Sequence, residues 1–533
     1  MRVADFFCGA GGFSEGFRQA GFEIVFAVDN WIQAVDTYRE NKNEFENLKV
    51  ICDDVIRISN LPDEEFNRLI PDTEIIIGSP PCVDFSNSNK SGKADKSKGI
   101  QLIEAYLRIV ARKYMSENSI LEYWILENVP NVEKYLKDQY TAKELGLDGD
   151  FILNVKNNGC ANVYNAKYFG APTSRKRYLC GNFPVPQRVC DGNNVRTLGD
   201  VLNSLGKTTA SNKIIEDPNY DGFTLPCSEV TDHFYSKYLA DFEWEKAKRL
   251  KQDMGYMGRM SFPEDVGKPS RTIMATMSAS SREAMILYDG IGYRLPTVRE
   301  VATLMSYPID YWFVGKNVAN KYKLVGNSVP PKLSYALAVA IMRERNMNYN
   351  AHYHRIAHTR CEKFINLNGN EYPLNIEKTK KYNSVFRYHI PYMKINQFRV
   401  ELTNKNSDFS KKIIKWNVEI HYSQGIYAKV YTPKVYVSKL SNALTEQNIS
   451  ELFCEINRLS KKYCYSKKRF HEIFRMTKID REQNNLYGPL ELLSEIKLFL
   501  SNQNYTDNVI DDLYPIKIYI GYYILKKVLC NMN

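Results

Sequence analysis

The 533-residue sequence contains no apolar run that approaches the length needed to cross a bilayer. It also lacks a disulfide framework, because its 11 cysteines are scattered and odd in number. The first residues, Met1–Asp5, lead directly into an expected strand, so we expect no signal peptide. These absences favour a cytoplasmic protein with reduced thiols, and the length suggests two to four domains.

The first 350 residues lack a net charge of either sign beyond −1, because they carry 43 basic and 44 acidic side chains. Residues 351–533 hold 29 Lys and Arg against 17 Asp and Glu, so the net charge of +11 comes from the last third of the chain. A basic region of this kind suggests a polyanion as partner, although lysines that are simply solvated give the same composition.

The motif Gly78–Ser86 (GSPPCVDFS) follows an apolar segment, Glu74–Ile77, that is typical of a buried strand. Two prolines stiffen the loop after this strand, at the edge where open α/β folds place their chemistry. Cys82 in this loop is therefore a candidate nucleophile. A buried structural cysteine is the alternative.

The N-terminal segment predicts a site for a nucleoside-type ligand. A strand, Arg2–Phe7, runs into the glycine loop Cys8–Ser14, then a helix, Glu15–Ala20, and a second strand, Glu23–Val28, that ends at Asp29. Glycines let a ligand approach the backbone, and the helix N-terminus offers free N–H groups. An acid at the end of the second strand suits a ribose diol.

Charged side chains follow or lie on further expected strands. The strand Lys49–Val55 ends in acids, and Asp54 with its apolar neighbour suits an adenine ring, unless it is an ordinary loop acid. Glu127, near the end of another strand, could support a ring nitrogen beside a thiol, or could simply face water. Arg175 and Arg177 alternate along a strand edge, and could reach one ligand or form a solvated face.

The remaining elements indicate three parts, namely a catalytic domain over 1–183 and 325–347, an irregular recognition domain over 184–324, and a basic α+β domain over 351–533. We expect a tight turn at Val325–Pro331. The other expected helices are 32–41, 100–118, 241–252, 294–305 with Thr297 as N-cap, 332–345, 446–462, 466–476 and 489–501, and the other expected strands are 151–157, 161–165, 177–181, 385–390, 416–422 and 427–437.

Seven pieces, in this order, resemble the cytosine-C5 DNA methyltransferases: DFFCGAGGFSEGF, the acid Asp29, GSPPCVDFS, LENVP, GAPTSRKRYLCG, RLPTVREVATLMSYP and VGNSVPP. The resemblance covers roughly residues 1–345 and does not extend to 351–533. It implies an α/β, doubly wound methyltransferase sheet that binds S-adenosyl-L-methionine, together with a small target-recognition domain. It also implies double-stranded DNA as substrate, with the target cytosine flipped out of the duplex.

The resemblance assigns roles to individual residues. Its catalytic residues are Cys82 as nucleophile, Glu127 as the acid at the ring nitrogen, and Arg175 and Arg177 beside the flipped base. Its cofactor residues are Phe6, Gly9, Gly11, Gly12, Phe13, Asp29, Asn30, Asp54, Val55, Pro81, Asn327 and Ser328. Its DNA-recognition residues are Ser86, Arg271 and Thr272. No metal is expected.

Two positions depart from the family pattern, which usually has Gln at the places of Thr173 and Val83. The nucleophile, the acid and the arginines are retained. The resemblance thus implies a bacterial or phage DNA (cytosine-5-)-methyltransferase that protects DNA beside a cognate restriction endonuclease. A tRNA methyltransferase of the same superfamily and a catalytically silent DNA-binding paralogue are the alternatives.

The C-terminal region has three possible roles, namely extra DNA binding, assembly, or a fused nuclease. The nuclease reading depends on Glu491 and the triplet Glu495-Ile496-Lys497. His352, His354, His358 and Cys361 also suggest zinc, but their spacing matches no strong zinc signature, and a solvated linker is the alternative.

Overall fold

The computed structural model describes residues 1–41, 47–81, 96–156, 158–209, 213–253, 258–358, 364–423, 428–441, 443–505 and 509–532. The chain divides into two compact units. Unit 1 comprises 1–239 and 263–373, and unit 2 comprises 240–262 and 374–533. The expected catalytic and recognition domains therefore share one unit, whereas the segment 240–262 groups with the C-terminal region.

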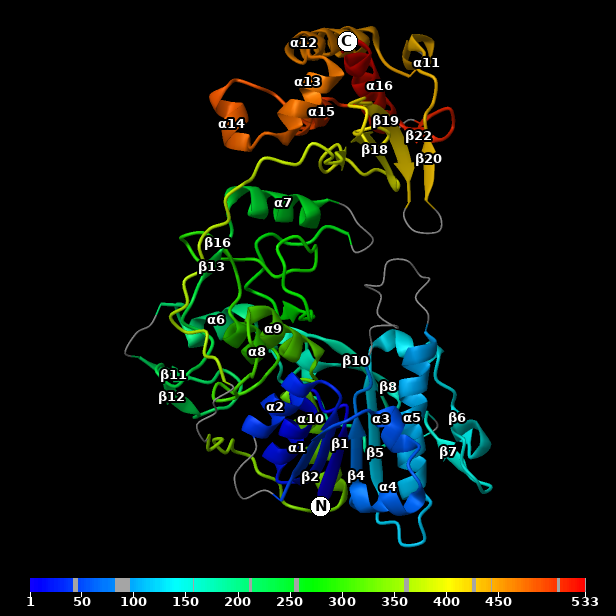
Figure 1. Ribbon diagram of the computed structural model, residues 1–533, viewed down its shortest axis with the longest axis vertical. Coiled ribbons are helices and arrows are strands. Elements are labelled where there is room, and N and C mark those ends of the chain that lie inside the picture. The colour runs from blue at the N-terminus through cyan, green and yellow to red at the C-terminus, as the bar shows by residue number, and fades with distance from the viewer. Residues whose placement is uncertain are drawn as a thin grey trace. The chain divides into compact units, whose positions relative to one another are not determined.

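A seven-stranded sheet forms the centre of unit 1, with the strand order β3-β2-β1-β4-β5-β10-β8 (Figure 1). Its strands are β1 (Arg2–Phe6), β2 (Glu23–Asp29), β3 (Lys49–Cys52), β4 (Ile75–Gly78), β5 (Tyr123–Asn128), β8 (Asn162–Asn165) and β10 (Lys176–Asn182). Neighbours among the first five pair in parallel, whereas β10 is antiparallel to both β5 and β8. The strand order reverses between β1 and β4, and such a switch point is where open α/β sheets bind ligands.

Helices cover both faces of this sheet, as expected for a doubly wound fold (Figure 1). On one face pack α1 (Gly12–Ala20), α2 (Ile32–Glu40) and α10 (Pro331–Glu344). On the other pack α3 (Val55–Ser59), α4 (Asp63–Leu69) and α5 (Ser97–Tyr114). The helix α10 lies more than 300 residues after α1 in sequence, yet the two pack closely, so the end of the methyltransferase-like region completes the sheet's first layer.

The rest of unit 1 consists of short elements. They are η1 (Pro130–Lys134), β6 (Gln139–Thr141), η2 (Lys143–Leu145), β7 (Ile152–Asn154), η3 (Ala166–Phe169), β9 (Thr173–Ser174), α6 (Leu198–Leu205), β11 (Ile214–Glu216), β12 (Thr224–Pro226), β13 (Lys237–Tyr238), β14 (Ser270–Arg271), β15 (Leu287–Tyr288), β16 (Tyr293–Leu295), α8 (Val298–Leu304) and α9 (Val318–Asn327). Thr297 caps α8 in a capping box, as its sequence predicts. The expected tight turn at Val325–Pro331 is wrong in its first half, because α9 continues to Asn327.

Unit 2 contains a four-stranded antiparallel sheet of order β17-β18-β19-β20, packed against helices. Its elements are α7 (Asp241–Gln252), β17 (Arg387–His389), β18 (Phe398–Thr403), β19 (Asn417–Tyr422), β20 (Lys429–Tyr431), α11 (Val437–Ser441), α12 (Glu446–Lys462), α13 (Lys467–Arg475), α14 (Lys478–Gln483), α15 (Pro489–Asn502), β21 (Val509–Ile510), β22 (Tyr514–Pro515) and α16 (Ile516–Cys530). Sequence patterns missed α16, because this helix is buried almost all round and so has no amphipathic period.

The described residues contain no disulfide, because every cysteine within these ranges is a free thiol. No helix in those ranges is long and apolar enough to cross a membrane.

Candidate active site

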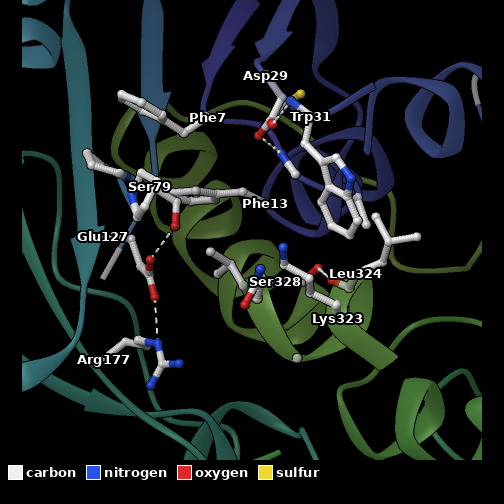
Figure 2. A pocket seen from close by; sticks show the side chains of 18 of the residues that line it. Phe7, Phe13, Asp29, Trp31, Ser79, Glu127, Arg177, Lys323, Leu324 and Ser328 are labelled. Atoms are coloured by element: carbon white, nitrogen blue, oxygen red, sulfur yellow. Dashed lines mark hydrogen bonds and ion pairs between the residues drawn. The ribbon is translucent and has the colours of Figure 1, made fainter. Parts of the chain in front are cut away.

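A pocket of about 270 Å³ opens at the C-terminal edge of the unit 1 sheet. The ends of β1, β2, β4 and β5 and the segment that joins α9 to α10 form its walls (Figure 2). It therefore lies at the switch point of the strand order, where this fold places a ligand.

The loop after β1 and the end of β2 form one side of the pocket (Figure 2). The Asp29 carboxylate accepts hydrogen bonds from the backbone N–H groups of Gly9 (3.0 Å) and Trp31 (2.8 Å). Burial raises the pKa of Asp29 above its usual range. Each carboxylate oxygen can accept more than one hydrogen bond, so Asp29 keeps acceptor capacity for a ligand. Asn30 and the indole of Trp31 continue this wall, and sequence reasoning missed the indole.

Of the two phenylalanines expected to contact the cofactor, Phe6 and Phe13, one does not reach the pocket. Phe13 lines the pocket as expected, but Phe6 is fully buried beneath the sheet against Phe26, with ring centroids 5.5 Å apart. Phe7 lines the pocket instead, with a left-handed backbone at φ 56°. Phe7 lies directly after the end of β1 and has a left-handed backbone, so strand alternation did not indicate the direction of its side chain.

The glycines of this loop have different physical roles. Gly9 lines the pocket at φ 54°, and a Cβ built on it would meet nothing within 4 Å, so its backbone faces open space. A Cβ on Gly12 would lie 2.3 Å from the Val329 carbonyl oxygen and 2.6 Å from the Tyr307 hydroxyl. Gly12 thus permits close packing of protein on protein, and neither it nor Gly11 lines the pocket.

The expected adenine pair lies away from the pocket walls. Asp54 is exposed and caps α3 by accepting from the backbone N–H of Ile56 at 2.8 Å. Val55 is 2 % exposed and belongs to the core under α5. The described residues therefore give Asp54 a capping role and Val55 a packing role.

Glu127 also lines the pocket, where it lies between Ser79 and Arg177 (Figure 2). Its Oε2 accepts from the Ser79 hydroxyl at 2.5 Å, and its Oε1 lies 2.8 Å from Nε of Arg177. Glu127 and Arg177 are 4 % and 7 % exposed. The structure therefore brings together an acid and an arginine that are 50 positions apart in sequence, and adds a serine hydroxyl that the sequence did not single out.

Arg175 makes contacts that its sequence pattern did not predict. It is 2 % exposed, and its guanidinium donates to the backbone carbonyls of Ile273 (3.1 Å), Gly326 (3.0 Å) and Ser328 (2.9 Å). Arg175 thus connects Ile273, in the expected recognition domain, to the end of α9 and the residue that follows it. Both arginines line the pocket, and Arg177 pairs with Glu127.

The recognition motif pairs with a strand that leads into the site. β14 (Ser270–Arg271) is parallel to β9 (Thr173–Ser174), and the Thr272 hydroxyl donates to the Ser174 carbonyl at 3.1 Å. The Thr173 hydroxyl, at a departure from the family pattern, donates to the carbonyls of Ser270 and Arg271. Arg271 forms an ion pair with Glu264, so its guanidinium is engaged within unit 1.

The end of α9 and the residues directly after it form another wall of the pocket. Asn327 and Ser328, the two residues of this segment with an expected cofactor role, both line the pocket. The Ser328 hydroxyl donates to the Leu324 carbonyl at 2.8 Å and accepts from the Tyr307 hydroxyl at 2.7 Å. Lys323 brings a positive charge to the rim, with its ammonium 4.6 Å from the centroid of the Trp31 ring.

Cys82 and Ser86 lie outside the described residues. Pro81, directly before Cys82, lines the pocket. Cys8 also lines it, but burial raises the pKa of this thiol far above its usual range, which keeps it protonated and poorly nucleophilic.

The remaining candidates are accounted for by other contacts. Both ring nitrogens of His358 lie within hydrogen-bond distance of backbone carbonyls, and the ring stacks on Trp312 at 4.0 Å, while Cys361 is outside the described residues. His352 and His354 are exposed. The carboxylate of Glu491 pairs with Arg481, and that of Glu495 pairs with Arg458 and Lys462. Within the described residues His358 is thus bound to the protein backbone, and the two glutamates of the proposed nuclease pattern are ion-paired.

Comparison with known proteins identifies the family. The fold and pocket define an α/β protein with a ligand site at the switch point of its sheet. Residues 1–343 match the family model "C-5 cytosine-specific DNA methylase", and the chain belongs to this family. The resemblance seen in the sequence is thereby confirmed.

Individual relatives are distant in sequence. Over 360 residues the chain is 28 % identical to "Type II methyltransferase M.MthTI" of Methanothermobacter thermautotrophicus, which covers 64 % of this chain and 98 % of the relative. It is 28 % identical over 350 residues to "Type II methyltransferase M.HgiDI" of Herpetosiphon aurantiacus, covering 65 % and 96 %. The crystal structure of S. pombe Dnmt2 methyltransferase aligns with 20 % identity and a TM-score of 0.42, covering 65 % and 100 %.

Proposed function

We propose that this protein is a DNA (cytosine-5-)-methyltransferase that uses S-adenosyl-L-methionine as methyl donor. The observation that carries the proposal is the position of Glu127 in the pocket that Asp29 also lines. Ser79 and Arg177 hold the Glu127 carboxylate in this position. Membership of the cytosine-C5 family supplies the reaction type, and the named relatives supply DNA as the substrate class.

The pocket residues fit this methyl donor. Asp29 has the acceptor capacity for two ribose hydroxyls, and the indole of Trp31 provides an apolar face for an adenine ring. The open space at Gly9 leaves room for a ligand against the backbone, and Phe7 and Phe13 give the pocket apolar walls. When bound, S-adenosyl-L-methionine supplies an electrophilic methyl group.

The protein's own side chains would activate the cytosine. Ring carbon C5 is a poor nucleophile until the Cys82 thiolate adds to C6, which gives C5 enamine character. Glu127 would hold N3 and the exocyclic amino group during this addition, and Arg177 would fix Glu127. After methylation a base removes the C5 proton, and the thiolate leaves from C6. The cytosine must first leave the duplex, at a cost of about a few kcal/mol.

The recognition segment would read the flanking bases in the duplex grooves. We infer further that the methylated motif is one that a cognate restriction endonuclease would otherwise cleave, as the names of the type II relatives suggest. This inference predicts methylation of every copy of one short motif in the genome of the source cell.

Transfer of a tritiated methyl group to duplex DNA and to tRNA, followed by bisulfite sequencing, tests the proposal. The wild type and a control, Cys454→Ala at an exposed thiol of unit 2, should methylate cytosine in one short DNA motif. Cys82→Ala should abolish transfer. Transfer to tRNA alone would move the substrate to RNA, and DNA binding without any transfer would identify a silent paralogue.

A further inference from the structure

The sheet of unit 2 has one apolar and one charged face. Val400, Leu402, Val418 and Ile420 point into the core that α16 completes. By the alternation of strands, Glu401 on β18 and Glu419 and His421 on β19 lie on the opposite face. These three polar residues are nevertheless buried, with only 5 %, 7 % and 4 % of their surface exposed.

The register of the two strands brings these side chains together. Glu401 pairs directly with Glu419 across the antiparallel ladder, and His421 is two positions further along β19. Nε2 of His421 lies 2.9 Å from Oε2 of Glu419 and 3.5 Å from Oε1 of Glu401. One ligand atom from each residue falls within 4.8 Å of the others. Two carboxylates opposite each other and buried are unfavourable unless a cation compensates them.

We propose that Glu401, Glu419 and His421 form a binding site for a divalent transition-metal ion in unit 2. Carboxylate oxygen and imidazole nitrogen bind such an ion at about 2.0–2.2 Å, which places two ligand atoms around one tetrahedral ion about 3.4 Å apart. The distances of 2.9 and 3.5 Å from Nε2 of His421 to the two carboxylates are already of this size. The mixed set of two oxygens and one nitrogen suits Mn²⁺ or Zn²⁺ better than Ca²⁺, which prefers oxygen ligands alone.

The side chains that now neutralise the carboxylates lie at the rim of the cluster. Lys405 contacts Glu419 at 2.7 Å, and Arg387 contacts Glu401, with 36 % and 54 % of the two basic side chains exposed. Arg399 lies 4.0 Å from Glu401. Each rim cation contacts one carboxylate, whereas His421 lies near both. A metal ion between the three ligands would therefore displace the exposed side chains of Lys405 and Arg387, whereas Arg399, whose side chain is 13 % exposed, would stay beside Glu401.

Burial favours the neutral form of His421, which is the form that binds a metal. Burial lowers the pKa of His421 below its usual range, against the opposing effect of Glu401 and Glu419. The pKa of Glu419 is lowered, because the hydrogen bonds and charges of Lys405 and His421 outweigh its burial.

Titration of the full-length, chelator-treated protein with MnCl₂ and with ZnCl₂ tests the site, with calorimetry for both ions and electron paramagnetic resonance for free Mn²⁺. We expect one ion per chain for at least one metal, and at least a tenfold loss of affinity in Glu419→Gln and in His421→Gln. Glu446→Gln, at an exposed glutamate at the start of α12, should bind as the wild type does.

Thermal unfolding with and without the ion distinguishes the loss of the metal site from a general folding defect of a variant. The ion should raise the unfolding temperature of the wild type and of Glu446→Gln, but not that of the two site variants. The absence of binding by the wild type, or equal binding by Glu419→Gln and Glu446→Gln, would overturn the proposal and identify the cluster as an ion-pair network closed by Lys405 and Arg387.

Discussion

Ser79 donates its hydroxyl hydrogen to Oε2 of Glu127 across 2.5 Å, while Arg177 holds the other carboxylate oxygen at 2.8 Å. Ser79 follows β4, Glu127 is on β5 and Arg177 is on β10, and these strands are neighbours in the sheet. The carboxylate on the middle strand is therefore oriented from both sides. This arrangement makes Ser79 a positioning residue for the proposed reaction.

Ser79→Ala should lower the rate of methyl transfer about tenfold or more, because a hydrogen bond to a charged group contributes about 1.5–3 kcal/mol. Single-turnover rates on duplex DNA measure the effect. Ser116→Ala, which removes a hydroxyl bound to a helix carbonyl, provides the control. A Ser79→Ala rate within twofold of the wild type would show that Arg177 alone orients Glu127.

Arg175→Lys should destabilise unit 1 by about 2–4 kcal/mol. A lysine ammonium cannot reproduce the planar fork that reaches the carbonyls of Ile273, Gly326 and Ser328, so buried acceptors would lose their donors. Chemical denaturation of the full chain measures the change in the free energy of unfolding. Arg68→Lys, at an exposed helix position, should have little effect, and equal stability of both variants would contradict this role.

Gly16→Ala should destabilise the protein by about 1–3 kcal/mol, although alanine normally favours a helix over glycine. Gly16 is buried in α1, and a Cβ there would lie 2.2 Å from the Ser334 hydroxyl and 2.4 Å from the Pro331 carbonyl oxygen. Thermal unfolding measures the effect. Gly192→Ala adds its Cβ in open space and is the matched control. A stabilised Gly16→Ala variant would show that α1 and α10 can separate without cost.

Asp5 should make the protein less stable as the pH rises. Burial raises the pKa of this carboxyl from 3.8 to about 8, against the opposing hydrogen bond from Ser14. Between pH 3.8 and about pH 8 the Asp5 carboxyl keeps its proton in the folded state but has lost it in the unfolded state. The free energy of unfolding therefore falls by about 1.4 kcal/mol per pH unit in this range.

Asp5→Asn, which stays neutral, should remove that contribution. Denaturant unfolding at pH 5, 6, 7 and 8 should therefore show the variant gaining stability relative to the wild type as the pH rises. Asp217 and Asp310 also have raised pKa values, of about 7 and about 6, but they are present in both proteins and cancel in the comparison. A constant difference across this range would contradict the prediction.

Local patterns were enough to locate the central sheet and two of its charged residues. Apolar runs with β-branched residues gave the strands that bear Asp29 and Glu127, because burial on both faces demands such runs. Ordered motifs gave the family, which the match over residues 1–343 confirms. In unit 2 the periodic helix α12 was found with its bounds, whereas the uniformly apolar α16 was not.

Only the tertiary structure distinguished residues that look alike in sequence. Arg175 and Arg177 are two positions apart, yet one donates to three backbone carbonyls and the other pairs with Glu127. These distant partners lie 50 to about 150 positions away, and no local pattern encodes them. The cluster of Glu401, Glu419 and His421 likewise depends on the register of two strands. The sequence thus determined which segments form strands and what chemistry they carry, and the packing of distant segments decided which side chains meet.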